Sequence, residues 1–199
     1  AITDRKNLPS ELFFSYVEKA LAQGIRAIQV REKDLSSIEL YRLCKTIKEI
    51  ADRSGAKVLV NDRCDIALSL NLDGVHLTER SIPADQARTL MGRGKLIGVS
   101  AHSMAGVIKA QTLGADFVVL GPVSATRSKW AGHAVMPAEE FRKCCEQSTL
   151  PVFALGGVHW DNAGLWLKHG AYGIAGISLW MSQDHAVPWD RLRTILGRF

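Results

Sequence analysis

Short apolar runs alternate along the chain with longer segments in which apolar residues recur every three or four positions. Phe117–Gly121 is apolar throughout, a pattern typical of a strand buried on both faces of a parallel sheet. Seven other runs have a similar character: Ala1–Thr3, Ala27–Arg31, Lys57–Asn61, Gly74–Leu77, Leu96–Ser100, Val152–Leu155 and Gly173–Ile177. The pattern therefore predicts eight short strands.

The segments between these runs have helical spacing and helix-end residues. Apolar positions within 12–21 and within 36–50 recur at the intervals of one helix face. Ser103 is predicted to cap a helix that runs to Leu113, and Gly114 is predicted to end it. The chain thus repeats strand and helix in alternation.

Strands that alternate with helices pair in parallel through right-handed crossovers. Eight such units form either a closed barrel or an open doubly wound sheet, and we favour the barrel. No linker or low-complexity stretch divides the chain. Residues 1–199 are therefore predicted to form one α/β domain, a single (β/α)8 TIM barrel.

Composition and charge narrow the functional classes. The 199 residues are 47% hydrophobic and carry a formal net charge of +5, with an isoelectric point near 9.1. This charge suits anionic ligands, but the Lys and Arg residues are scattered and form no dense basic block. We therefore expect small anionic ligands and no nucleic acid.

The cysteines and the apolar pattern indicate where in the cell the protein is expected. Cys44, Cys64, Cys144 and Cys145 lack metal-ligand spacing, so reduced cytosolic thiols are the simplest interpretation. No signal peptide and no run of 18 apolar residues occurs, so we expect a cytoplasmic protein that does not enter a membrane. The chain opens in what resembles the tail of a strand, which leaves open whether residues precede Ala1.

In a barrel, functional side chains come from the loops at the carboxyl ends of the strands. The second predicted strand leads into a stretch where alternation points Gln29, Arg31 and Lys33 the same way. Such cations suit an anionic substrate. The alternative is a surface ladder of ion pairs with Glu32 and Asp34.

Two further strand ends carry candidate groups. Asn61 and Asp62 follow the third strand, and the carboxylate of Asp62 can bind a hard cation through oxygen. The alternative for Asp62 is a helix N-cap. The fifth strand leads into Ser100 and His102, and a lone histidine at such a place is either structural or catalytic.

The loop after Gly121-Pro122 contains Thr126, Arg127, Ser128 and Lys129. Hydroxyls beside a cation at the end of a buried strand suit a phosphate-type anion, and the alternative is a solvated basic loop.

Glycines follow the last two strands, at Gly156-Gly157 and at Gly176. Barrel enzymes commonly build a phosphate cup from backbone N–H groups there, although tight turns also use glycine. Cations and glycine turns on one face together imply a substrate with more than one phosphate.

These stretches resemble one family: thiamin phosphate synthase, with its close relative the thiazole tautomerase. The resemblance covers nearly the whole chain. It is carried by Gln29-Val30-Arg31-Glu32-Lys33, Asn61-Asp62, Asp73-Gly74-Val75-His76-Leu77, Gly98-Val99-Ser100-Ala101-His102, Gly121-Pro122-Val123, Thr126-Arg127-Ser128-Lys129 and Gly156-Gly157.

The resemblance implies an enzyme that joins hydroxymethylpyrimidine diphosphate to thiazole phosphate, releases pyrophosphate and uses Mg²⁺. It implies that diphosphate leaves first, that a pyrimidine-stabilised cation forms, and that the thiazole nitrogen captures this cation. A departing diphosphate builds up negative charge, which cations and a metal stabilise. The resemblance also implies a homodimer.

The same resemblance assigns roles to residues. Arg31, Lys33 and Lys129 would stabilise the diphosphate, Gln29 would contact the pyrimidine, Asn61 and Ser100 would hold the diphosphate, and Asp62 would bind Mg²⁺. Thr126 and Ser128 would face the thiazole phosphate, whose oxygens would rest on the amides of Gly157, Ile177 and Ser178.

The chain departs from the family pattern at two places. After His76-Leu77 the synthases usually read Gly-Gln-x-Asp, with the Asp as a second carboxylate for Mg²⁺. Here residues 78–81 read Thr-Glu-Arg-Ser, so Ser81 offers only a neutral oxygen at that position. Met136-Pro137 replaces a common Gln-Gly pair.

These departures leave two alternatives to the synthase. The first is a thiazole tautomerase, which shares the barrel and the phosphate cup and moves a proton with a histidine at the position of His102. Imidazole suits proton transfer near neutral pH. The second is a non-catalytic phosphate-ligand-binding relative that has lost the metal site.

Overall fold

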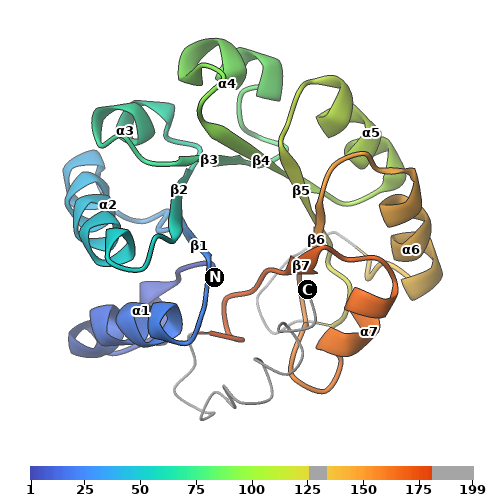
Figure 1. Ribbon diagram of the computed structural model, residues 1–199, viewed down its shortest axis with the longest axis horizontal. Coiled ribbons are helices and arrows are strands. Elements are labelled where there is room, and N and C mark those ends of the chain that lie inside the picture. Colours follow the sequence, from blue (N-terminus) through green and yellow to red (C-terminus); the bar gives the residue numbers. More distant parts are fainter. Residues whose placement is uncertain (126–133, 181–199) are drawn as a thin grey trace.

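A computed structural model describes residues 1–125 and 134–180. Seven parallel strands form one sheet in the order in which they occur along the chain. They are β1 (Ala27–Val30), β2 (Lys57–Asn61), β3 (Gly74–Leu77), β4 (Leu96–Ala101), β5 (Phe117–Leu120), β6 (Val152–Ala154) and β7 (Gly173–Ile174). The sheet curls around a central axis (Figure 1). The fold is thus a TIM-like parallel α/β fold.

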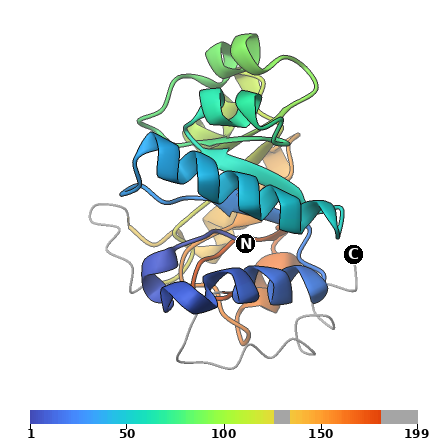
Figure 2. The same cartoon turned by 90° about the vertical axis from the view of Figure 1, so that its left-hand side faces the viewer.

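The helices lie outside the curled sheet (Figure 1). They are α1 (Phe13–Ala22), α2 (Ser37–Asp52), α3 (Cys64–Ser69), α4 (Ala84–Met91), α5 (Met104–Thr112), α6 (Ala138–Gln147) and α7 (Ala163–Lys168), and two short 3₁₀ turns, Arg5–Asn7 and Ser10–Leu12, precede α1. In chain order, α1 precedes β1, and each of the helices α2 to α7 follows one strand and precedes the next. Figure 2 shows α1 and α2 as neighbours on the outer surface.

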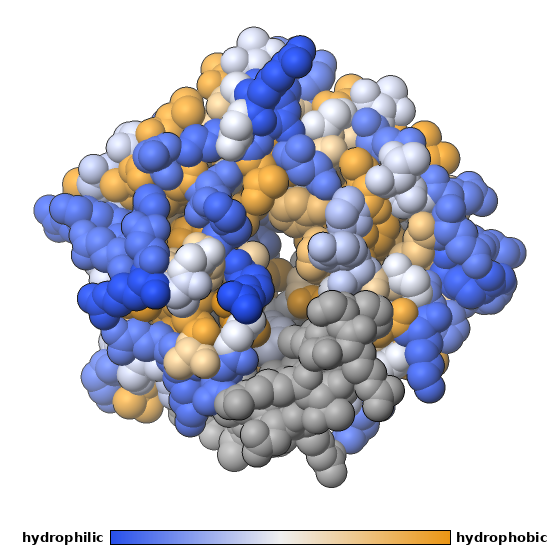
Figure 3. Space-filling model, viewed as in Figure 1, coloured by the Kyte–Doolittle hydropathy of each residue, from blue (hydrophilic) through white to orange (hydrophobic). Residues whose placement is uncertain are grey.

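The main core lies between the strands and the inward faces of the helices. Side chains from both layers, such as Val17, Ile47, Val60 and Phe141, are fully buried there. At about 25 cal/mol per Å² of apolar surface, each such side chain contributes about 1.5–3 kcal/mol. The space-filling view shows a hollow near the middle of the visible face, with hydrophilic residues over the outer helices (Figure 3).

The first predicted strand is present only as a single bridge. Ile2 bridges Gln29 in parallel, and the amide of Thr3 donates to the Gln29 carbonyl at 2.9 Å. On the other side, the Ile2 amide donates to the Gly176 carbonyl at 2.9 Å. The N-terminal segment therefore lies between β1 and the residues after β7, but it does not extend into a strand.

The last predicted strand is also shorter than expected, and ends at Ile174 rather than Ile177. Only Gly173 and Ile174 pair with β6, because the chain turns at Ile177, whose carbonyl accepts from the Trp180 amide at 3.0 Å. The structure thus confirms the parallel α/β class and seven of the eight strands.

The helix-end predictions for α5 are confirmed. The Ser103 hydroxyl accepts from the Gly106 amide at 3.3 Å, and Gly114 takes the left-handed conformation with φ +77° two residues after the helix ends. In α2, Ser36 and Glu39 form a reciprocal capping box. Among the described residues, no helix combines the length and the apolar character needed to cross a membrane.

Candidate active site

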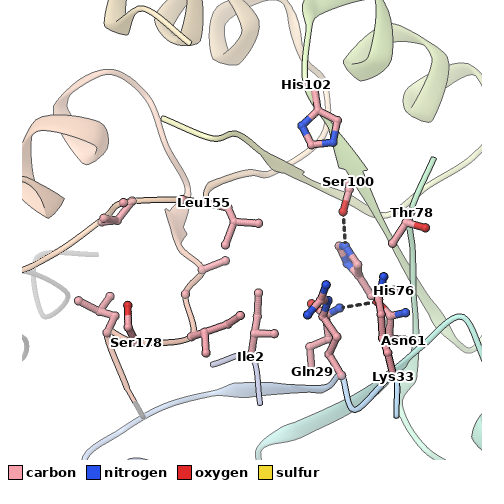
Figure 4. Close-up of a pocket in the computed structure, with 18 of the residues that line it drawn as sticks. Ile2, Gln29, Lys33, Asn61, His76, Thr78, Ser100, His102, Leu155 and Ser178 are labelled. Carbon is pink, nitrogen blue, oxygen red and sulfur yellow. Dashed lines mark hydrogen bonds between the residues drawn. The ribbon is translucent and has the colours of Figure 1, made fainter. Parts of the chain in front are cut away.

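A cavity of about 360 Å³ lies at the carboxyl ends of the strands, within the size range of small-molecule sites. Its polar wall comes from β1 to β4, and its other wall from Ile2, Leu155 and the turn at Ser178 (Figure 4). Nine of the predicted site residues line it: Gln29, Arg31, Lys33, Asn61, Ser100, His102, Gly157, Ile177 and Ser178. Parallel pairing thus brings together residues that are far apart in the sequence.

Four other predicted site residues remain. Three of them, Thr126, Ser128 and Lys129, lie outside the described residues. Asp62 is exposed and lies beside the cavity wall, where Asn61 contacts it. The predictions for the 126–129 loop therefore stay predictions.

Gln29, Arg31 and Lys33 all line the cavity, as the alternation along the chain predicted. The alternative, an ion-pair ladder with Glu32 and Asp34, does not form. Within residues 1–125 and 134–180, neither Arg31 nor Lys33 takes part in an ion pair. Both cations thus remain able to meet an anion in the cavity.

The two carboxylates next to these cations bind the N-terminal 3₁₀ turn instead. Asp34 pairs with Arg5 and with Lys6, the latter at 3.3 Å. Glu32 is buried and accepts from the Arg5 amide at 3.1 and 3.2 Å. Burial raises the pKa of Glu32, and hydrogen bonds from Thr3 and Arg5 oppose this rise. The turn thereby neutralises the carboxylates that would compete for Arg31.

An ordered chain of hydrogen bonds crosses the polar wall. The Gln29 amide donates to Asn61 Oδ1 at 3.1 Å, and the Asn61 amide donates to Asp62 Oδ2 at 2.6 Å. The Ser81 hydroxyl donates to the other Asp62 oxygen. Asp62 itself has a left-handed backbone, with φ +63°, and Arg63 rather than Asp62 is the N-cap of α3. The helix-cap alternative for Asp62 is therefore wrong.

The donors present fit Mg²⁺ only in part. Asp62 and Ser81 offer adjacent oxygens, which a hard cation prefers. Across the described part of the chain, no group of three His, Cys, Asp or Glu side chains could hold a metal ion. Mg²⁺ often binds through one or two carboxylates plus substrate phosphates. Asp62 and Ser81 thus suit a cation that a phosphorylated substrate brings with it.

His76 is a site residue to which the sequence analysis gave no role. Its ring is buried in the cavity wall, and Nε2 lies 2.9 Å from the Ser100 hydroxyl oxygen (Figure 4). Burial, helped by the charge of Arg31, lowers the pKa of His76 to about 4. His76 pairs with Asn61 across β2 and β3. The alternation of side chains along its strand was the only sequence signal that His76 could face the cavity. The residues that it meets depend on the register between strands, which cannot be read from the sequence.

The low pKa of His76 predicts a pH-dependent stability. The folded state keeps the ring neutral down to about pH 4, whereas the unfolded chain protonates it near pH 6.5. Stability should therefore fall as pH drops from 6.5 to 4, by about 3 kcal/mol from this group. Denaturant unfolding of wild type and His76→Gln across this range measures the difference. Parallel pH curves for the two proteins would contradict the prediction.

His102 lies half-buried at the end of β4 and its Nδ1 contacts the Gly121 carbonyl. A carbonyl oxygen only accepts, so Nδ1 carries the proton and donates it. In the neutral ring, Nε2 is then the proton acceptor. His102 also lines the cavity, and imidazole is a side chain that can transfer protons near neutral pH.

Glycines shape the opposite wall of the cavity. Gly156 and Gly157 have φ of +92° and +65°, and a Cβ at Gly157 would come within 2.4 Å of the Ala125 carbonyl oxygen. Among the described residues, the amides of Gly157, Ile177 and Ser178 find no hydrogen-bond acceptor. Adjacent free amides beside a cavity are suited to the oxygens of an anion.

Replacing Gly157 by alanine should destabilise the fold by about 1–3 kcal/mol, through the left-handed backbone and the contact with the Ala125 carbonyl. It should also weaken binding of phosphate ligands. Gly164→Ala in α7 is the matched control, because a Cβ there meets nothing within 4 Å. The control should be neutral or slightly stabilising. Thermal unfolding and phosphate titration measure both, and equal behaviour of the two variants would contradict the role of Gly157.

The fold and the cavity together define a TIM-like protein whose cavity at the strand ends is lined in part by cationic side chains. The profile described as thiamine monophosphate synthase matches residues 1–179. The chain therefore belongs to the thiamine monophosphate synthase family.

Individual relatives agree with this family. A homologue from Geobacter sulfurreducens is 42% identical over 196 residues, 98% of this chain and 91% of its own length. The thiamine-phosphate synthase of Clostridium acetobutylicum is 35% identical over 89% of this chain and 83% of its own. The solved structure of thiamine phosphate pyrophosphorylase from Pyrococcus furiosus is 34% identical and superposes with a TM-score of 0.87, over 99% of this chain and 94% of that one.

Proposed function

We propose that this protein is a thiamin phosphate synthase. The bond from the pyrimidine methylene carbon to the diphosphate oxygen would break first, so that pyrophosphate leaves, and the thiazole nitrogen would then form a bond to that carbon. The observation that carries this proposal is the pair of cations, Arg31 and Lys33, which line a cavity of suitable size and, among the described residues, take part in no ion pair. Membership of the family supplies the reaction class.

The arrangement of the cavity supports distinct roles for its two walls. On the polar wall, Arg31 and Lys33 would bind the diphosphate and stabilise the charge that develops as it leaves. Gln29, fixed by Asn61, would present its side chain to the pyrimidine. On the other wall, the amides of Gly157, Ile177 and Ser178 would hold the thiazole phosphate.

Mg²⁺ is the proposed cofactor, held by Asp62 and Ser81. When bound, it would neutralise charge on the diphosphate oxygens. Asn61 would hold the Asp62 carboxylate in place through the 2.6 Å hydrogen bond. No proton transfer from the protein is required for the diphosphate to leave.

We also propose that residues Ala1–Thr3 complete a closed eight-stranded barrel. This is supported by hydrogen bonds on both sides of the segment, from Gln29 N to the Ala1 carbonyl at 2.8 Å and from Ile2 N to the Gly176 carbonyl. Slow hydrogen exchange at the Ile2 amide would agree with closure, and fast exchange would contradict it. The homodimer and the cytoplasmic location stay predictions.

The direct test of the function is incubation with both substrates and Mg²⁺. Formation of thiamin phosphate and pyrophosphate in equal amounts is the expected result. Binding of both ligands without turnover at any Mg²⁺ concentration would overturn the synthase proposal and favour the non-catalytic alternative.

A thiazole tautomerase is the second candidate, because His102 lines the cavity with its Nε2 as the acceptor. If His102 is a general acid/base, His102→Ala should abolish isomerisation of the thiazole carboxylate phosphate and leave ligand binding within about threefold, since such catalysis is worth about 10²–10⁴-fold. In a synthase, the same change should leave coupling mostly intact. Assays of both reactions on one preparation measure this, and loss of coupling in a folded His102→Ala protein would contradict the assignment.

A further inference from the structure

The pair formed by His76 and Ser100 is left unexplained by the roles above. The two residues come from neighbouring strands, β3 and β4, and both line the cavity. Their side chains are 3% and 8% exposed, and Nε2 of His76 lies 2.9 Å from Oγ of Ser100. Either atom can be the donor in such a pair, so the contact alone does not fix the direction of the hydrogen bond.

The surroundings of His76 favour one position for its proton. A neutral imidazole has one N–H, on either Nδ1 or Nε2. Nδ1 lies beside Gly98, where an added Cβ would come within 2.8 Å of it, and the ring centroids of His76 and Phe117 are 6.1 Å apart. Among the described residues, Nδ1 has no hydrogen-bond partner.

A proton on Nδ1 would have no acceptor among the described residues, whereas a proton on Nε2 has Ser100 Oγ as its acceptor. Burial keeps the ring neutral at physiological pH, since the pKa of His76 is lowered to about 4. The favoured state of the pair therefore has Nε2–H donating to Ser100. The Ser100 hydroxyl has a single proton, and the imidazole cannot then accept it.

We propose that His76 is a positioning residue that makes the Ser100 hydroxyl a hydrogen-bond donor into the cavity, toward a diphosphate-type anion. Deprotonated phosphate oxygens only accept, so a hydroxyl whose lone pair is already occupied by His76 is oriented for them. His76 acts through Ser100 and does not touch the ligand. This inference rests on the proposed function for the identity of the anion, but its tests do not require turnover.

The first test observes the proton directly. NMR of the protein with labelled histidine reports which imidazole nitrogen of His76 carries hydrogen, at neutral pH, with and without inorganic pyrophosphate and Mg²⁺. The Nε2–H form in both samples is expected. The Nδ1–H form would mean that Ser100 donates to His76, and would overturn the proposal.

The second test is a double-mutant cycle on binding of inorganic pyrophosphate with Mg²⁺, measured by calorimetry. His76→Leu removes the donor and should weaken pyrophosphate binding by about tenfold, the range of a hydrogen bond to a charged group. His76→Gln retains an amide donor and should bind within about threefold of wild type. In the Ser100→Ala background, His76→Leu should have no further effect.

Two controls separate positioning from a general loss of structure. Thiazole phosphate binds the opposite wall, so its affinity should be the same in wild type and His76→Leu. If both ligands weaken equally, His76 is merely structural. If His76→Leu does not fold, the comparison of His76→Gln with wild type and the NMR result still decide the proposal.

The outcomes also separate this inference from the proposed function. The wild-type protein could fail to make thiamin phosphate while the double-mutant cycle gives the expected result. This outcome would refute the synthase proposal and keep the His76–Ser100 pair as part of a diphosphate-binding site. Independent, additive effects of the two substitutions in a fully active synthase would refute the inference alone.

Discussion

Replacing Arg31 by alanine is expected to lower the rate of thiamin phosphate synthesis by about tenfold or more. A charge-assisted contact to a developing anion contributes about 1.5–3 kcal/mol, and each 1.36 kcal/mol corresponds to a factor of ten in rate. Arg31 lines the cavity, while the neighbouring Asp34 pairs with Arg5 and Lys6 rather than with Arg31. The full benefit of its charge is therefore available to the diphosphate.

Single-turnover kinetics with saturating substrates measure this effect on the chemical step. Arg42→Ala is the matched control, because Arg42 is an exposed arginine of α2 outside the cavity. The control should have the wild-type rate. Lys33→Ala should behave like Arg31→Ala. Wild-type turnover in both cavity variants would show that Arg31 and Lys33 are only solvated surface cations.

Removing the charge of Asp62 is expected to be more severe, with a loss of about 10²–10³ in turnover, the range for one preorganised electrostatic group. With Ser81 in place of a second carboxylate, no other anion among the described residues contacts Asp62 to compensate. Asp62→Asn is the better variant than alanine, because asparagine tolerates the left-handed backbone at φ +63° and alanine does not. A Mg²⁺ titration of turnover under saturating substrates measures the effect.

The reciprocal change, Ser81→Asp, should lower the Mg²⁺ requirement. Ser81 already contacts one Asp62 oxygen, so an aspartate there places two carboxylates side by side. When a chelator removes Mg²⁺, the two carboxylates repel each other. This repulsion should lower the melting temperature by about 2–4 °C, which corresponds to about 1 kcal/mol in a chain of this size. Added Mg²⁺ should reverse this loss.

Ser81→Asn has the shape of the aspartate without its charge and is the control. It should show neither the loss in chelator nor the recovery with Mg²⁺. If Ser81→Asp is indifferent to Mg²⁺ in both stability and turnover, and Asp62→Asn remains active, the metal is not bound at these two residues.

The amino-acid sequence by itself determined the repeat of strand and helix and the end of the strands at which the cavity lies. Alternation along one strand is local, so it placed Gln29, Arg31 and Lys33 on the cavity side correctly. The Ser103 cap and the Gly114 stop are also local signals, and the structure confirms both. Local geometry needs no knowledge of which strands are neighbours.

The tertiary structure alone decided the contacts between distant parts of the chain. It paired Asp34 with Arg5 rather than with Lys33, joined Ser81 to Asp62, and set His76 against Ser100. It also reduced the first predicted strand to one bridge at Ile2. Each of these depends on sheet register and curvature, which are fixed by the packing of the whole core. Periodicity tells which way a side chain points, but only the assembled sheet determines what it meets.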